Sequence, residues 1–432
     1  MTILTFPKIK IGKPLIVFFI LLLIFCGAYK TPVGIVSVSI VIFLMAVLKI
    51  AFYICTYKNN LIFHFQKEIN PYFYFCCILI FLFIYSLIRF LYFDIGDQLF
   101  IDLQLKQYSI AIISSVVFFF LINSWMINIS EKDLYKGVFI FLIFEIIFNA
   151  YQSLFPSFKL WFISVTALNG HWLEFAINSL RGIGLQGLSI WDTSISYALL
   201  SFVSIIVIKK KKLIYFSLFI LPIIILTILS GRTGLIYLII FIFLILFCLR
   251  KGHYIFPLSA LTIALIFYLY YIENSLIVKI IDFSFELFIN IINGKMESNS
   301  TNDLIQNHLF FPELVHPVLG DNIYIGDGDV IKSSLGRSSD SAFVINYSAY
   351  GILGFLSTIA FVFLCTKILY QYFPLVRYRR PILRYIIYLF SFLMAFGLFI
   401  KVPVYVSATL LKTMVFVSIC MLNINKNIQV SK

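Results

Sequence analysis

The chain has 432 residues, of which 62% are hydrophobic and only 12% are charged, and its mean hydropathy is +1.02. Soluble domains are about 45–50% apolar and about 25% charged, so this composition excludes a water-soluble globule. It also excludes a disordered chain, which needs low hydrophobicity. The formal net charge of +14 would suggest nucleic acid in a soluble protein, but in this chain membrane topology has to be considered first.

Apolar runs long enough to cross a bilayer recur along the whole chain. A helix needs about 20 apolar residues for this, and backbone polar groups in lipid need internal partners, so the runs are expected to be helices. Strands of a β-barrel would alternate apolar and polar residues over about 10 positions. The twelve expected spans are 14–29, 33–53, 71–93, 108–127, 134–155, 190–208, 213–229, 233–249, 255–272, 341–370, 382–402 and 404–422. The sequence predicts an all-α, single integral membrane domain over 1–432 with about 12 transmembrane helices.

Basic residues are distributed unevenly between the two expected sides of the membrane. With the N-terminus inside, the inner segments carry 18 basic and 3 acidic residues, and the outer segments carry 10 basic and 14 acidic residues. Cytoplasmic loops of membrane proteins carry an excess of lysine and arginine. Both termini are therefore expected to be cytoplasmic, and the net charge of the chain follows from topology. It indicates no nucleic-acid partner.

Two loops on the expected outer side are long, 156–189 and 273–340. The larger one lies between spans nine and ten. Over 274–293 its polar residues recur at helical spacing with apolar residues between them, which predicts an amphipathic helix in the membrane interface. No GxxxxGK[ST] motif is present, so ATP hydrolysis by this chain is not expected.

Three arginines of the outer segments are candidates for binding an anion. Arg181 opens a glycine-rich stretch, Arg232 lies in the turn Ser230-Gly231-Arg232-Thr233-Gly234, and Arg337 lies three residues before Asp340. Arginine presents a planar charged fork that suits phosphate, and the helix start after Arg232 adds free N–H groups. The alternative for Arg232 is an anchor for the turn at the lipid headgroups.

Carboxylates and histidines of the same loops are candidates for acid–base chemistry. Asp340 at the start of span ten is expected either to cap that helix or to act as a general base toward a hydroxyl. His171, Glu174 and His316 are secondary candidates. The Asp327-Gly328-Asp329 stretch does not match a calcium loop, and no metal or cofactor is expected.

Two ionisable residues are expected deep in the bilayer. Glu145 lies in the middle of span five and Lys412 in the middle of span twelve. An ionisable group at such depth is a functional candidate, and it keeps a transporter open as an alternative. A purely structural alternative pairs the two with each other or with Arg89.

At these residues the chain resembles the O-antigen polymerase and ligase group of bacterial envelope enzymes. The shared features are the twelve-span plan with a large loop after span nine, the Arg181 stretch, the Ser230-Gly231-Arg232-Thr233-Gly234-Leu235 turn, and His316-Pro317-Val318-Leu319-Gly320 followed by Asp340-Ser341-Ala342-Phe343 and Tyr350-Gly351-Ile352-Leu353-Gly354. The motifs cover about residues 181–354, and their order is more specific than any one of them.

The resemblance implies a glycosyltransferase of the bacterial inner membrane that acts at the periplasmic face. The donor would be a glycan on undecaprenyl pyrophosphate, and an acceptor hydroxyl would attack its anomeric carbon as the lipid pyrophosphate leaves. Arg181, Arg232 and Arg337 would stabilise the leaving group, and Asp340 would act as the base. Membrane lipid, a flippase and a chain-length regulator are the partners implied.

The chain departs from the group at one position. Ligases of the group usually have a histidine near the end of the large loop, where this chain has Asp340-Ser341. The departure favours a polymerase over a ligase that transfers glycan to lipid A-core. A lipid-linked glycan flippase or other transporter is the alternative from a different functional class.

Overall fold

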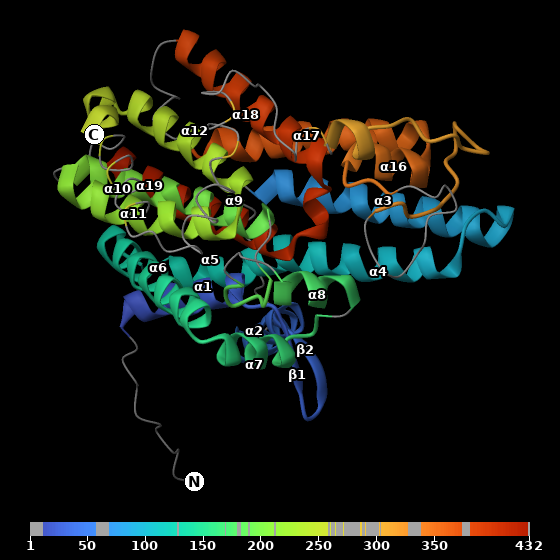
Figure 1. The fold of residues 1–432 in the computed structure, drawn as a ribbon, viewed down its shortest axis with the longest axis horizontal. Helices are drawn as coiled ribbons and strands as arrows, with labels where there is room; N and C mark the ends of the chain where they lie inside the picture. The colour runs from blue at the N-terminus through green and yellow to red at the C-terminus, as the bar shows by residue number, and fades with distance from the viewer. Residues whose placement is uncertain are drawn as a thin grey trace.

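The computed structural model describes residues 12–57, 69–127, 129–168, 170–178, 183–188, 191–210, 213–257, 304–326, 338–373 and 381–430, together with residues 260, 264, 271, 286, 290 and 302. Within these residues the chain is a bundle of helices with one small hairpin (Figure 1). The first half contains α1 (Lys13–Phe25), β1 (Ala28–Thr31), β2 (Gly34–Ser37), α2 (Val38–Tyr57), α3 (Asn70–Phe93), α4 (Gln98–Ile112), a π-helical turn (Ile113–Val117), α5 (Phe118–Met126), α6 (Glu131–Leu154), α7 (Pro156–Val165) and α8 (Gly170–Asn178). The second half contains α9 (Trp191–Leu200), α10 (Ser204–Lys210), α11 (Leu213–Ser230), α12 (Arg232–Cys248), α16 (Ala342–Tyr350), α17 (Ile352–Gln371), α18 (Pro381–Lys401) and α19 (Ala408–Val430).

Among the described residues, six helical segments are long and apolar enough to cross a membrane. They are Asn70–Phe93, Gln98–Met126, Glu131–Leu154, Trp191–Ile208, Ile352–Gln371 and Pro381–Lys401. Five shorter apolar helices, Lys13–Phe25, Val38–Phe52, Ile214–Ser230, Arg232–Cys248 and Ala408–Ile424, lie at further expected spans. The chain is an all-α membrane protein. Most of the expected ninth span, 255–272, lies outside the described residues, as does most of the helix expected over 274–293.

α9 and α10 form the centre of the bundle. The span Trp191–Ile208 is almost wholly buried, and α9 packs against α11, α12 and α19 (Figure 1). At Gly234 of α12 the two helices α9 and α12 approach closely, and an added Cβ would lie 2.3 Å from the carbonyl oxygen of Ser194. Gly137 permits a similar approach of α6 to α1, where a Cβ would meet the carbonyl oxygen of Pro14 at 2.6 Å. Small residues thus set the distances between buried helices, as is common in membrane bundles.

The fourth expected span begins ten residues earlier than the sequence predicts. Asp97 caps α4 by accepting a hydrogen bond from the Leu99 amide at 3.0 Å, so the helix includes polar residues before the apolar run. One of them, Gln104, is buried and hydrogen-bonds to the Tyr350 hydroxyl. Contacts with α16 therefore extend this helix, and the predicted boundary at 108 was wrong.

The second expected span begins later than predicted. Residues 28–37 form an antiparallel hairpin with Ala28 opposite Ser37, and α2 begins at Val38. The hairpin joins the rest of the chain through Tyr29, whose backbone forms a β-bridge with Thr166 after α7. These backbone pairings replace the first turn of the helix expected from residue 33.

The tenth expected span, 341–370, is two helices and not one. α16 ends at Tyr350, and α17 begins at Ile352 after Gly351, whose φ is +61°. Glycine adopts this left-handed conformation without the strain that a side chain would add. The break brings the C-terminal carbonyl groups of α16 to the segment 315–322, whose Asp321 and Asn322 amides donate to them.

Candidate functional site

The turn between α11 and α12 lies against the buried helix α9. α12 begins directly at Arg232, and Ser194 of α9 accepts a hydrogen bond from the Gly234 amide at 3.1 Å. The glycines of the predicted motif are therefore explained in part by helix packing, since Gly234 lies against the backbone of Ser194. Arg232 remains at the first position of the helix, where unsatisfied N–H groups and the positive end of the helix dipole favour an anion.

A second cation lies at this turn, and sequence reasoning did not single it out. The Nζ atom of Lys401, the last residue of α18, donates to the Thr233 hydroxyl at 2.9 Å. Lys401 therefore stands beside the residue that follows Arg232. The sequence offered one signal for it, a lysine at the end of an otherwise apolar span.

Arg232 already binds a carboxylate of the chain. Its guanidinium forms an ion pair with Glu286, a residue of the large loop, and both side chains are mostly buried. Of the helix expected over 274–293, Glu286 and Asn290 are the described residues that are helical. The ion pair shows that the guanidinium of Arg232 is oriented to bind an anionic oxygen, and that Glu286 of the large loop reaches the α11–α12 turn.

Asp340 lies next to a histidine that the sequence left unassigned. The Asp340 amide donates to Nδ1 of His308 at 3.2 Å, and the Ser339 hydroxyl donates to the His308 carbonyl oxygen at 2.6 Å. Because Nδ1 accepts this bond, it carries no proton, and the proton of the neutral ring is on Nε2. The N-cap position of α16 belongs to Ser341, so the expectation that Asp340 caps this helix was wrong by one residue.

The last turns of α18 connect Arg232 with the start of α16. The ring of Phe396 lies 5.6 Å from that of Phe343, three residues after Asp340. Lys401 is five residues further along α18, about 7.5 Å of helix rise, and it contacts Thr233. The start of α16 and the α11–α12 turn therefore both contact the last turns of α18, although more than one hundred residues separate Arg232 from Asp340 in the sequence.

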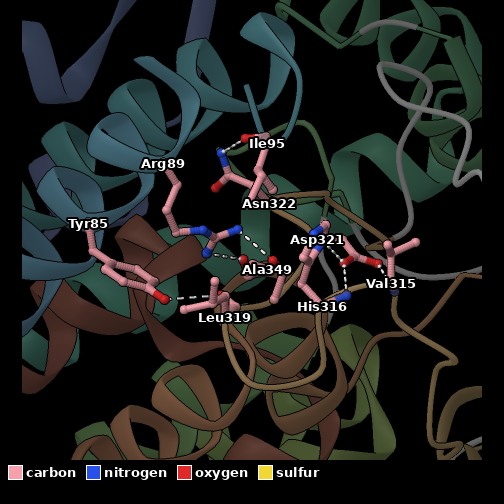
Figure 2. A network of polar contacts seen from close by, with 10 residues as sticks. Tyr85, Arg89, Ile95, Val315, His316, Leu319, Asp321, Asn322 and Ala349 are labelled. Carbon is pink, nitrogen blue, oxygen red and sulfur yellow. Dashed lines mark hydrogen bonds and ion pairs between the residues drawn. The ribbon is translucent and has the colours of Figure 1, made fainter. Parts of the chain in front are cut away.

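The segment 315–322 is fastened to α3 and α16 (Figure 2). The buried guanidinium of Arg89 donates to the carbonyl oxygens of Ala349 at 3.0 Å and Gly320 at 2.7 Å. The carboxylate of Asp321 accepts from the amides of Val315 and His316 at 2.9 and 2.8 Å, and it lies 3.3 Å from the His316 ring. His316 thus belongs to the loop framework.

The two glycine motifs after Arg232 contact each other. Gly320 and Gly351 both have positive φ, and a Cβ on either would lie 2.3 Å from backbone atoms of the other motif. The Ile352 amide donates to the Val318 carbonyl oxygen at 3.2 Å. Each glycine is therefore required by close backbone approach, which explains why His316–Gly320 and Tyr350–Gly354 occur as a pair.

The ionisable residues in the spans do not pair with one another. Glu145 accepts from the Tyr197 hydroxyl at 2.8 Å and the Leu185 amide at 3.4 Å, and Lys412 donates to the Leu23 carbonyl oxygen at 2.7 Å. Arg89 binds the carbonyl groups described above. The structural alternative, in which Glu145 and Lys412 pair with each other or with Arg89, was therefore wrong, because each residue bonds to backbone groups or to a tyrosine instead.

Some of the candidate residues predicted in the loops lie outside the described residues. Arg181 and Arg337 lie outside the described residues, as does the side chain of His171, and Glu174 is exposed on α8. The segment 183–188 that follows Arg181 is largely buried within the bundle. Two of its amides, those of Gly184 and Leu185, donate to side chains of α6, which gives the glycine-rich stretch a structural role.

The chemistry of this end of α18 combines cations, a hydroxyl and a carboxylate. Arg232 and Lys401 suit an anionic group with several oxygens, and Asp340 with His308 provides groups that accept and donate protons. In the described part of the chain, no three residues of the His, Cys, Asp and Glu types are grouped as for a metal ion. Comparison with known family models and with curated proteins found no match to this chain.

Proposed function

We propose that this chain is a membrane glycosyltransferase that joins lipid-pyrophosphate-linked glycan repeat units, a polysaccharide polymerase. The observation that carries the proposal is the cationic turn formed by Arg232 and Lys401, with a carboxylate of the large loop bound to Arg232. A site that holds one anionic oxygen at a helix start suits a pyrophosphate leaving group. The donor is activated already, so the reaction needs no nucleotide-binding domain.

The acceptor hydroxyl needs a base while the donor's glycosidic bond to pyrophosphate breaks. We assign this role to Asp340, since a carboxylate can take the proton of the attacking hydroxyl. His308 supports the assignment, because its contact with the Asp340 backbone fixes the position of the segment. The new bond forms between the acceptor oxygen and the anomeric carbon, and the electron pair leaves on the pyrophosphate that Arg232 and Lys401 neutralise.

The test is the glycan ladder of cells that carry variants of the chain. Arg232→Ala and Lys401→Ala are expected to abolish long glycan chains while the protein level persists. Arg232→Lys is expected to retain part of the activity, since it keeps the charge and loses the planar fork. Asp340→Asn is expected to abolish polymer without loss of protein. Normal chain length in Arg232→Ala and Lys401→Ala together would reject the proposal.

Two other functions have a specific observation in their favour. His308 lies beside Asp340, where ligases of the O-antigen group usually have a histidine in the sequence itself, and this favours a ligase. The buried Glu145 and Lys412 favour a transporter, because a path for protons or ions would use such residues.

Deletion of the gene for this chain, followed by analysis of the cell-surface glycan, separates the three functions. Loss of a polymerase leaves a single repeat unit on the surface, loss of a flippase leaves none, and loss of a ligase leaves polymer on the lipid carrier.

A further inference from the structure

Three polar side chains of α6 contact the segment 183–188 from one face of the helix. Glu145, Asn149 and Gln152 are spaced four and three residues apart, and all three are buried. Glu145 accepts from the Leu185 amide at 3.4 Å, Asn149 Oδ1 accepts from the Gly184 amide at 3.2 Å, and Gln152 Nε2 donates to the Gly184 carbonyl oxygen at 3.4 Å. We call these three residues the α6 ladder.

Other elements complete the attachment of the same segment. The Tyr29 hydroxyl donates to the Leu185 carbonyl oxygen, and burial raises the pKa of this phenol, which keeps it protonated. The Gln186 side chain binds Thr409 of α19 and accepts from the Thr193 hydroxyl of α9 at 3.1 Å. Gly184 and Gly187 have positive φ, so the segment is bent where these partners hold it.

These contacts form a continuous path from α6 to the cationic turn. Gln186 contacts Thr193, the next residue Ser194 accepts from the Gly234 amide at 3.1 Å, and Gly234 lies two residues after Arg232. A displacement of 183–188 would therefore displace the start of α9, and with it the first turn of α12. No member of the ladder contacts Arg232 directly, so its effect on the turn would be indirect.

We infer that Glu145 and Asn149 are positioning residues, which hold residues 183–188 and thereby hold Arg232 in the orientation that binds the donor pyrophosphate. The inference rests on the proposed function for its catalytic consequence, but the mechanical connection does not depend on it. Burial within the bundle strengthens the role, because a buried amide that loses its acceptor has no water to replace it. In this role Glu145 needs an acceptor oxygen and not a charge.

Substitutions at Glu145 separate this role from that of a proton or ion carrier. Glu145→Gln retains an oxygen that can accept from Leu185 and Tyr197, so nearly wild-type activity is expected. Glu145→Leu removes the acceptor, and at least a tenfold loss of kcat/KM for the lipid-linked donor is expected, mainly through a higher KM. If both variants lose activity equally, the charge itself is required and the inference is overturned.

Hydrogen exchange tests the mechanical connection without any reaction. In purified full-length protein in detergent, the Gly184 and Leu185 amides are expected to be protected in the wild type and in Glu145→Gln. In Asn149→Leu and Glu145→Leu, exchange is expected to be at least tenfold faster at these amides and also faster over the first turn of α12. Ser153→Ala is the matched control, because Ser153 lies on α6 and its hydroxyl bonds within that helix, to the Asn149 carbonyl oxygen at 3.0 Å.

The kinetic measurement and the hydrogen-exchange measurement distinguish failure of this inference from failure of the proposed function. Unprotected amides at Gly184 and Leu185 in the wild type, or unchanged exchange over the first turn of α12 in Asn149→Leu, would overturn the inference whatever the protein catalyses. Altered exchange with unchanged kcat/KM would also overturn it. Altered exchange in a protein whose wild type transfers no glycan would support the mechanical connection and reject the proposed function.

Discussion

At the scale of single residues, Arg232 has two competing anions, the carboxylate of Glu286 and the proposed pyrophosphate. Both would use the same guanidinium, which presents a limited number of donors in one plane. Donor binding at Arg232 therefore requires that Glu286 move or share the guanidinium. The ion pair of the large loop would then lower the affinity of the site for the donor.

Replacement of Glu286 tests this competition. Glu286→Gln removes the charge of the carboxylate and keeps its size, so we expect KM for the lipid-linked donor to fall severalfold. Initial rates of glycan transfer by the purified protein would measure it. Glu313→Gln is the control, since Glu313 is an exposed carboxylate of the same loop. An unchanged KM in Glu286→Gln would show that the two anions do not compete.

Gly351 is a residue whose identity is required by backbone geometry. Its φ is +61°, and an added Cβ would lie 2.3 Å from the Val318 carbonyl oxygen. Backbone strain of this kind costs about 1–3 kcal/mol, and the close contact adds to it. We expect Gly351→Ala to lower the melting temperature of the purified protein by several degrees.

Gly252→Ala is the matched control for Gly351→Ala. No atom lies within 4 Å of a Cβ added at Gly252, so a shift much smaller than that of Gly351→Ala is expected. Thermal unfolding followed by intrinsic fluorescence would compare the two. Equal melting temperatures for both variants would contradict the role given to Gly351.

At the scale of elements, the end of α16 is capped by a distant segment of the chain. The amides of Asp321 and Asn322 donate to the carbonyl oxygens of Ser348 and Ala349 at 3.0 and 3.1 Å. Arg89 of α3 donates to the carbonyl oxygens of Ala349 and of Gly320, the residue before Asp321. A cation at the C-terminus of a helix also interacts favourably with the helix dipole. Arg89 therefore joins α3, the large loop and α16.

Removal of Arg89 should detach this segment. Hydrogen bonds from charged groups contribute about 1.5–3 kcal/mol each, and Arg89→Met would lose two of them and leave the Gly320 carbonyl oxygen without this donor. We expect faster hydrogen exchange over 315–322 and a lower melting temperature. Lys367→Met on α17 is the control, because Lys367 is exposed. Unchanged exchange over 315–322 would contradict the role of Arg89.

At the scale of the whole molecule, the charge asymmetry predicts the orientation of the bundle. With 18 basic and 3 acidic residues, the segments that include both termini are expected to face the cytoplasm. A green fluorescent protein fused after Lys432 should fluoresce, and alkaline phosphatase inserted in the polar stretch 297–302 should be active only if the large loop is outside. The reverse pattern of the two reporters would invert the topology.

The sequence by itself determined the class of the protein and the positions of most helices. Long apolar runs are local signals, and a backbone in lipid has to satisfy its own polar groups, so a run of about 20 apolar residues predicts a helix without knowledge of its neighbours. The turn at Ser230–Gly234 was also evident, since its glycines and single arginine interrupt two such runs. The boundaries of α2, α4 and α16 were missed, because capping and backbone pairing set them.

Only the tertiary structure decided which polar groups meet. Lys401 reaches Thr233, His308 lies against Asp340, and Glu145 holds Leu185 across intervals of 168, 32 and 40 residues. Nothing in a local pattern specifies such partners, since hydrophobic periodicity records which face of a helix is buried and not what it is buried against. A polar group buried in a membrane protein needs a hydrogen-bond partner. The sequence shows which polar residues lie in apolar spans and so need one, but only the packing of the bundle determines which partner each of them has.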